Sequence, residues 1–433
     1  MAERIKLGLT RNRLFEFYNC VSFLGEVDEA FDIQQCERAL KILSLKEPLL
    51  GGVVELCENG EAYIVTEKSE PSLEVYNGDE KSFVDRKKRE GIDFSKQLFS
   101  FAVLNDKTLG VFAHTVVADV RTLMYLAGEF VNVYRSAPAS VVPSETKVIS
   151  DKTQLPSKAY SIVIERLSSD LEIGWQKNPK AFTKEDYETA REKYLSDGSD
   201  SETIIMKISE PMLTDLKAFA KKESVDVSSL IAFSFYEALT ETLGGKRRYK
   251  KLNVQANERV FFEDSQKMRV GAFNGLVTVE KKKNKKVPDT LENNAINFHK
   301  EIYKRITNSF SVFYNEFLFL RLPENFADSQ YMYCSGVFQH KYSEKLANTY
   351  GCANEVVGEF CSYNLNQSYW SSLNQFTRIC PSEPLKMRSS TLITFVEKGC
   401  EGEVHFNYKK DKISDSVAQN VVEKVAELLK KFK

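Results

Sequence analysis

The chain has 433 residues, of which 42% are hydrophobic and 28% are charged, and its formal net charge is −1. This length exceeds one ordinary domain and predicts two or three, each large enough to bury a sizeable core. A net charge near zero provides no overall field that would attract nucleic acid or an anionic membrane, so neither is expected as a partner.

The lack of a recognisable targeting signal and the pattern of cysteines both predict an intracellular protein. The N-terminal stretch MAERIKLGLTRNRLFEF is charged throughout, so we expect no signal peptide, and no apolar run approaches the roughly 18–20 residues of a membrane span. The eight cysteines form no CxxC pair, which argues against zinc and thioredoxin-type sites. Scattered thiols without a secretion signal predict a cytoplasmic location, and the scarcity of histidines disfavours a nucleophilic cysteine.

The first half of the chain alternates helices with strands. Asp32 and Gln35 resemble a capping box at the start of the first clear helix, which Pro48 ends. The further elements expected in this half are a hairpin over 51–65, two strands within 98–117 and a helix over 120–136. This order predicts one mainly antiparallel sheet in an α+β arrangement.

A linker separates this half from the rest. Residues 137–158 lose periodicity and gain Pro, Ser and Thr. The elements expected after it are a helical region over 159–197, strands over 202–208, 251–257, 272–280, 359–365, 390–397 and 402–410, and helices after Ser209 and over 228–243, 290–307 and 414–432. We therefore predict an N-terminal subdomain over 1–136, a linker over 137–158 and a C-terminal subdomain over 159–433.

The stretch FAHTVVADVRTL carries one of only four histidines, His114, five residues ahead of Asp119. A strand runs through His114 into a short turn, and a helix follows it. Neighbouring side chains of a strand point to opposite faces, so His114 and Thr115 cannot serve the same surface.

The order of elements resembles the condensation domains of peptide synthetases and their acyltransferase relatives, which include alcohol acetyltransferases, wax-ester synthases and chloramphenicol acetyltransferase. Their shared motif, H-H-x-x-x-D-G, stands here as HTVVADV, residues 114–120. Further segments that are similar to family motifs are RALKILSLKEPLLGGVV, DFSKQLFSFAVL (93–104), VQANERV (254–260), RVGAFNGLVTV (269–279) and SYNLNQ (362–367). The resemblance covers nearly the whole chain as an ordered series of weak motifs.

This resemblance implies two chloramphenicol-acetyltransferase-like α+β subdomains side by side, with a tunnel between them. It also implies an acyl thioester donor, either acyl-CoA or a phosphopantetheine carrier protein, and a small alcohol or amine acceptor, with no tightly bound cofactor. Asn257, Asn274 and Asn364 fall in the matching motifs and are expected to line the tunnel.

The family position of the general base is Thr115 here. A threonine hydroxyl cannot usefully accept a proton near pH 7, and such a base is worth roughly 10²–10⁴ in rate. His114 should point away from the surface that Thr115 faces, so we predict a structural role for it, unless a bulge re-aims it as the base.

For the aspartate of this motif, the resemblance implies a structural role. By the resemblance, Asp119 forms a salt bridge with Arg259, and Arg121 is the local alternative. Val120 replaces a glycine that leaves room for the pantetheine arm in relatives, so donor access should narrow. The remaining histidines are solitary and have no carboxylate at metal-ligand spacing, so no metal site is predicted; His405, in an alternating strand, is expected at the surface or hydrogen-bonded.

Two functions follow from these observations. The first is an acyltransferase that acts by positioning and an oxyanion contact, with His114, the substrate or a water as the base. The second is a catalytically inactive member that binds a carrier protein, an acyl ligand or a biosynthetic partner. The missing histidine favours the second and the fold favours the first.

Overall fold

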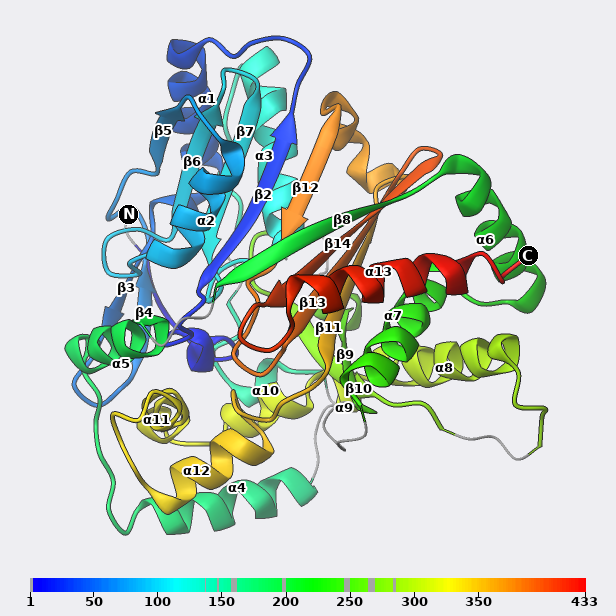
Figure 1. The fold of residues 1–433 in the computed structure, drawn as a ribbon. Helices are drawn as coiled ribbons and strands as arrows, with labels where there is room; N and C mark the ends of the chain where they lie inside the picture. Colours follow the sequence, from blue (N-terminus) through cyan, green and yellow to red (C-terminus); the bar gives the residue numbers. More distant parts are fainter. Residues whose placement is uncertain are drawn as a thin grey trace.

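The computed structural model describes residues 3–136, 138–145, 148–156, 162–196, 200–244, 250–263, 269–282 and 286–433. These residues form two larger sheets, a small third sheet and the helices that cover them (Figure 1). The α+β class predicted from the sequence is confirmed. The predicted linker is described only over 138–145 and 148–156, and the rest of it lies outside the described residues.

The N-terminal sheet has the strand order β12-β2-β7-β6-β5. Its neighbouring strands pair antiparallel, except that β5 and β6 run parallel. The strands are β2 (Cys20–Glu26), β5 (Ser72–Tyr76), β6 (Phe99–Leu104), β7 (Thr108–His114) and β12 (Arg378–Ser382), and the helices beside them are α1 (Ile33–Lys46), α2 (Glu80–Glu90) and α3 (Val120–Arg135). The small sheet, in the order β1-β4-β3, consists of β1 (Arg4–Lys6), β4 (Ala62–Val65) and β3 (Val53–Leu56).

Alternate side chains of the N-terminal sheet enter two different cores. On β7, Val111 and Ala113 belong to the main core, whereas Phe112 joins a second cluster with Phe83 of α2. The sheet is therefore covered on both faces, which is why its strands read as nearly continuous apolar runs. Half of the predicted capping box forms at the start of α1. The Asp32 side chain accepts a hydrogen bond from the Gln35 N–H, but the Gln35 side chain donates to the Tyr134 carbonyl instead of returning to Asp32.

The C-terminal sheet has the strand order β10-β9-β11-β13-β14-β8. Its strands are β8 (Ser201–Ile208), β9 (Leu252–Asn257), β10 (Asn274–Val279), β11 (Gly358–Asn364), β13 (Thr391–Lys398) and β14 (Glu401–Lys409), and the helices beside it are α6 (Glu210–Glu223), α7 (Val227–Leu243), α8 (Leu291–Ile306) and α13 (Asp415–Leu429). Strand β11 runs parallel to both its neighbours, β9 and β13, and the other pairs are antiparallel.

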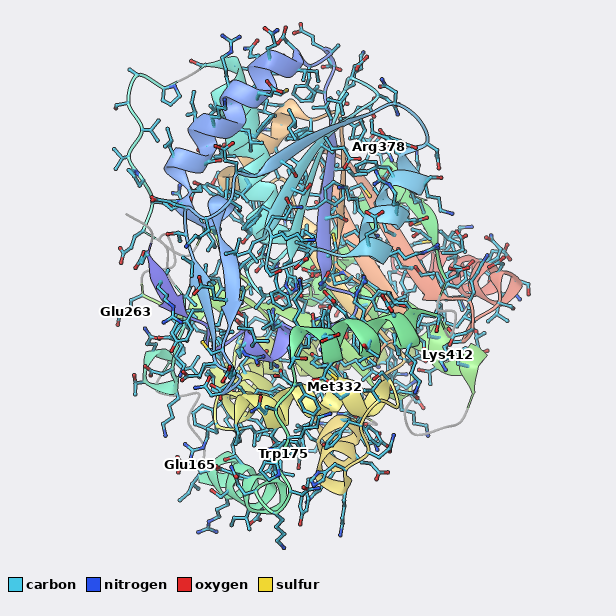
Figure 2. All side chains as sticks on the ribbon, turned by 90° about the vertical axis from the view of Figure 1, so that its left-hand side faces the viewer. Glu165, Trp175, Glu263, Met332, Arg378 and Lys412 are labelled. Carbon is cyan, nitrogen blue, oxygen red and sulfur yellow. The ribbon has the colours of Figure 1, made fainter. Side chains whose placement is uncertain are left out.

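A layer of helices closes the lower side of the molecule in the view of Figure 1. These helices are α4 (Ile162–Trp175), α5 (Lys184–Ser196), α9 (Ser309–Val312), α10 (Tyr314–Phe319), α11 (Glu324–Cys334) and α12 (Lys341–Thr349). Trp175 and Met332 mark this layer in Figure 2. The indole of Trp175 stacks on Phe326 with ring centroids 5.0 Å apart, so α4 and α11 share a common core.

Strand β12 crosses the predicted subdomain boundary. It comes late in the chain, in the part assigned to the C-terminal subdomain, yet it pairs with β2 at the edge of the N-terminal sheet. The predicted subdomains, which end at residue 136 and begin at residue 159, stay a prediction. Any such division has to account for β12, which belongs to the later part of the chain but pairs within the N-terminal sheet. Among the helices that the structure describes, none is long and apolar enough to cross a membrane.

Candidate functional site

A buried ion pair lies just beyond strand β7. Arg259 Nη1 lies 2.6 Å from Asp119 Oδ2, and Nη2 lies 3.1 Å from Oδ1, while the two side chains are 9% and 1% exposed. The backbone N–H groups of Thr122 and Phe273 also donate to the carboxylate. Burial alone would raise the pKa of Asp119, but the charge and hydrogen bonds of Arg259 outweigh it and lower that pKa.

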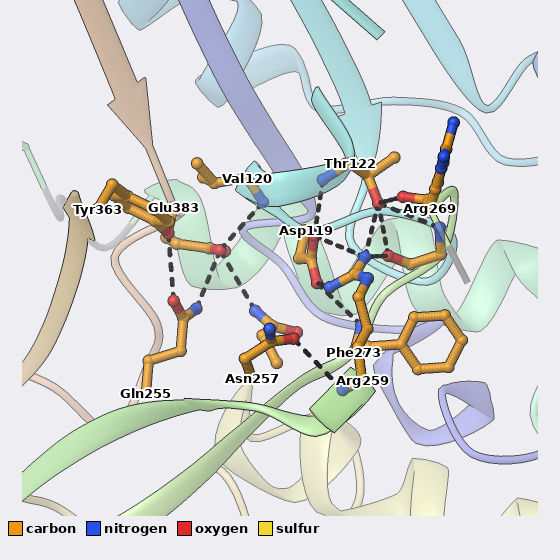
Figure 3. A network of polar contacts seen from close by, with 12 residues as sticks. Asp119, Val120, Thr122, Gln255, Asn257, Arg259, Arg269, Phe273, Tyr363 and Glu383 are labelled. Carbon is orange, nitrogen blue, oxygen red and sulfur yellow. Dashed lines mark hydrogen bonds and ion pairs between the residues drawn. The ribbon is translucent and has the colours of Figure 1, made fainter. Parts of the chain in front are cut away.

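The structure therefore brings Asp119 and Arg259 together, whereas Arg121 lies over the ring of Tyr363. The turn after β9 positions Arg259, because the Asn257 side chain accepts a hydrogen bond from its backbone N–H. Figure 3 shows how the guanidinium also reaches Thr122 across the contact between α3 and the turn after β9. A bidentate pair of this kind, fully hydrogen-bonded, links two parts of the chain 140 residues apart.

His114 is the last residue of β7, and its ring is sealed in the core. The residue has 0% exposure, Nδ1 accepts a hydrogen bond from the Val116 N–H at 3.1 Å, and Nε2 has no hydrogen-bond partner among the described residues. Burial, assisted by the cationic Arg191 and opposed by Asp93, lowers the pKa of His114 to about 3. The imidazole is therefore neutral across the physiological range.

Thr115 occupies the position of the general base that the resemblance implies, and its side chain is also buried. It is 3% exposed, and its Oγ1 is buried without a hydrogen-bond partner among the described residues. Its backbone N–H donates to the Asn19 carbonyl at 2.8 Å, which fixes the turn out of β7. Neither Thr115 nor His114 lines either of the two clefts described below.

Two larger clefts lie on either side of a polar contact. One, here called the β8 cleft, has a volume of about 370 Å³ and lies between α2, β8 and β14; Lys88, Lys410 and Glu383 are among its lining residues. The other, the Trp370 cleft, has a volume of about 480 Å³ and is lined by Tyr363 and Trp370 among others. The resemblance implies a through-going tunnel between the subdomains, and that tunnel stays a prediction.

A chain of hydrogen bonds joins residues that line the two clefts (Figure 3). The Tyr363 hydroxyl donates to Gln255 Oε1 at 3.1 Å, and Gln255 Nε2 donates to Glu383 Oε1 at 3.0 Å. The same Glu383 oxygen accepts from the Val120 N–H and from Asn274 Nδ2, each at 3.3 Å. Because Glu383 lines one cleft and Tyr363 the other, this chain connects the linings of the two clefts.

The remaining predicted residues divide between this contact and the clefts. Val120 is fully buried beside Glu383, where its side chain takes up space that a glycine would leave open. Asn274 also accepts a hydrogen bond from Arg13, while Asn364, at the end of β11, lines the Trp370 cleft. Asn257 caps the turn that holds Arg259 and lines neither cleft.

A buried acidic group escaped the sequence analysis. Glu258 has 0% exposure, and neither carboxylate oxygen has a hydrogen-bond partner among the described residues. Burial and the neighbouring Glu316 raise the pKa of Glu258 well above its ordinary value, even though Arg13 acts in the opposite direction. Glu383, whose pKa burial also raises, was missed for the same reason: nothing in the local sequence marks these glutamates as buried.

Comparisons with known proteins identify the fold. No family model matches the chain, and no curated protein matches it. Solved structures do: the epimerization domain from the third module of tyrocidine synthetase B matches with a TM-score of 0.63 and 13% identity, covering 99% of this chain and 97% of that one. The condensation domain from the monacolin K polyketide synthase matches with a TM-score of 0.62 and 10% identity, over 99% and 97%.

A third structure, the cyclization-docking bidomain of a peptide synthetase from Sorangium cellulosum, matches with a TM-score of 0.64 and 12% identity, covering 99% of this chain and 84% of that chain. At these identities the likeness establishes the fold. The protein therefore has the condensation-domain fold over essentially its whole length, as the sequence analysis predicted.

Proposed function

We propose that this protein binds an acyl thioester, carried by CoA or by a carrier protein, without transferring the acyl group to an alcohol or amine through its HTVVADV motif. The proposal rests on the burial of the two residues at the end of β7. Thr115 stands at the position predicted for the base, its hydroxyl is buried, and the adjacent His114 is a sealed neutral imidazole. General-base catalysis requires a group within hydrogen-bond reach of the acceptor, and the motif offers none.

The β8 cleft is the proposed thioester site. It lies where the N-terminal sheet and α2 meet strands of the C-terminal sheet. Lys88, Arg89 and Lys410 line it together with four acidic residues, Asp85, Asp200, Glu202 and Glu383. These cations suit the phosphate of a phosphopantetheine arm. In this proposal the chain of hydrogen bonds through Glu383 separates the β8 cleft from the Trp370 cleft, so a thioester bound here would not face an acceptor entering from that side.

The first test is acceptor-dependent turnover. Wild type, incubated with acyl-CoAs and mixed alcohol and amine acceptors, should show no continuous thiol release that depends on the acceptor. Thr115→His restores the family residue, and Thr115→Leu controls for its bulk without providing a base. Acceptor-dependent turnover by the wild type would contradict the proposal.

The second test is binding. Calorimetric titration with CoA should show an interaction that weakens about tenfold in Lys410→Glu, since this change reverses a charge at the cleft. Lys412→Glu is the matched control, because Lys412 does not line the cleft yet lies two residues away (Figure 2). Equal binding by both variants, or none by the wild type, would exclude the β8 cleft as the thioester site.

A further inference from the structure

A cysteine, a histidine and a glutamate meet where the two larger sheets come together. Cys380 lies on β12 of the N-terminal sheet, and His405 and Glu403 lie on β14 of the C-terminal sheet. Cys380 Sγ is 3.4 Å from His405 Nδ1, and His405 Nε2 is 3.4 Å from Glu403 Oε2. Glu403 and His405 are two residues apart on one strand, so they share a face of the sheet.

This arrangement has the form of a nucleophile, a base and an orienting carboxylate. With both ring nitrogens protonated, the imidazolium donates one hydrogen bond to the sulfur and one to the carboxylate. Burial opposes the charge on the ring, but Cys380 and Glu403 outweigh it and raise the pKa of His405 to about 9. In spite of burial, His405 also lowers the pKa of the Cys380 thiol, with smaller contributions from Lys88 and Arg378.

The surroundings favour an anionic sulfur and admit a small reactant. Lys88 of α2 donates a hydrogen bond to Ser382, which lies two residues from Cys380 on the same strand, and Lys88 also lines the β8 cleft. Arg378, on the other side of Cys380 along β12, pairs with Glu80 at 3.3 Å. Cys380 is only partly buried, in contrast to Cys20 and Cys361, which are fully buried. The thiol is thus flanked by cations, and Lys88 connects its strand with the proposed thioester site.

We propose that Cys380, His405 and Glu403 form a nucleophilic thiol site in which the Cys380 thiolate accepts the acyl group of a small thioester. The choice of a thioester as the electrophile rests on the proposed function. The cysteine sulfur bonds to the carbonyl carbon, and the carbon–sulfur bond of the thioester breaks. The departing thiolate takes the proton carried by the His405 imidazolium, which leaves S-acyl Cys380, a free thiol and a neutral imidazole.

The experiment uses the full chain and two probes. With iodoacetamide at about pH 6, peptide mass spectrometry should show Cys380 alkylated about tenfold faster than Cys400, an exposed thiol that serves as an internal control. With S-acetyl-N-acetylcysteamine, one acetyl group should appear on Cys380, removable by hydroxylamine. His405→Asn should abolish the rate advantage and the acetylation, and circular dichroism should show that this variant remains folded.

The outcomes separate the two proposals. Alkylation of Cys380 no faster than that of Cys400 overturns the activated thiolate, and fast alkylation without acetylation overturns the acyl acceptor. Neither result depends on CoA binding, because the small thioester carries no phosphopantetheine. The proposed binding function fails separately, in the titration with CoA. Should His405→Asn unfold, Glu403→Gln replaces it, with an expected partial loss of the rate advantage.

Discussion

The two histidines that the structure buries in strands, His114 and His405, are in opposite charge states. Burial and a nearby arginine keep His114 neutral, with a pKa lowered to about 3, whereas a thiol and a carboxylate keep His405 charged, with a pKa raised to about 9. Both lie in strands, and both are at most 4% exposed. Because burial and strand position are the same for both histidines, the difference in charge comes from the side chains around each ring. These neighbours therefore decide whether a buried histidine can take part in chemistry.

The largest expected effect tests whether the motif region now serves stability. Asp119→Asn removes a charge that Arg259 and two backbone N–H groups require, and breaking a buried ion pair on one side costs about 3–5 kcal/mol. Chemical denaturation should show this loss in the free energy of unfolding. The control is Asp170→Asn, at an exposed carboxylate of α4, which should change the free energy by less than about 0.5 kcal/mol.

The pH dependence of stability tests the neutral state of His114. Its folded pKa of about 3 lies below the unfolded value of about 6.5, so the unfolded chain takes up the proton first. The contribution to stability is complete above about pH 6.5 and is lost as the pH falls towards 3, at up to about 1.4 kcal/mol per pH unit. His114→Asn retains an acceptor for the Val116 N–H without titrating, and its unfolding free energy should fall less steeply between these limits. Equal slopes would mean that His114 takes up its proton at the same pH in the folded and unfolded states, and thus that its pKa is not lowered by folding.

A smaller effect tests whether Thr115 has lost its chemical role. The Thr115 hydroxyl is buried without a partner among the described residues, and such a group costs about 1–3 kcal/mol to bury. Thr115→Val keeps the shape and removes the hydroxyl, so the unfolding free energy should rise by about 1 kcal/mol. A loss of stability of similar size would show instead that the hydroxyl has a bound partner and that the site remains open to ligands.

The smallest effect concerns the carboxylate beside His405. The Glu403 side chain is 34% exposed, so solvent screens its charge. Glu403→Gln should slow iodoacetamide alkylation of Cys380 by roughly two- to fivefold, since a partly exposed charge contributes less than about 1 kcal/mol. An alkylation rate unchanged from the wild type would mean that Glu403 does not contribute and that the site consists of Cys380 and His405 alone.

Much of the fold could be predicted from the sequence, because its strands and helices carry local signals. Apolar periodicity and capping residues located the first helix, the hairpin and the closing helix. The approach of Asp119 to Arg259 followed from the resemblance, which supplied the pairing of two distant motifs. By contrast, β2, β5, α2 and β12 escaped prediction, and the strands among them gave no clean alternation by which to recognise them.

The parts of the sites that depend on distant contacts could not be predicted. Cys380 and His405 lie on different sheets, and no spacing rule relates them. Glu258 and Glu383 are buried in the folded protein, but nothing in the sequence around them distinguishes them from surface glutamates. His405 was expected to be at the surface or hydrogen-bonded; it is hydrogen-bonded, and the partners give it a charge that the sequence did not indicate.

The strand exchange also has a consequence for how the chain matures during translation. Strand β2 is made within the first 26 residues, but its partner β12 ends at Ser382, which pairs with Ser22, so contacts between the two strands span as many as 360 residues. A ribosome adding roughly 5–20 residues per second needs tens of seconds to cover that interval. Throughout this time the edge of β2 offers unpaired backbone groups to other nascent chains. A chaperone that shields this edge, or slow codons placed after residue 382, would change the yield of the protein without altering a single residue.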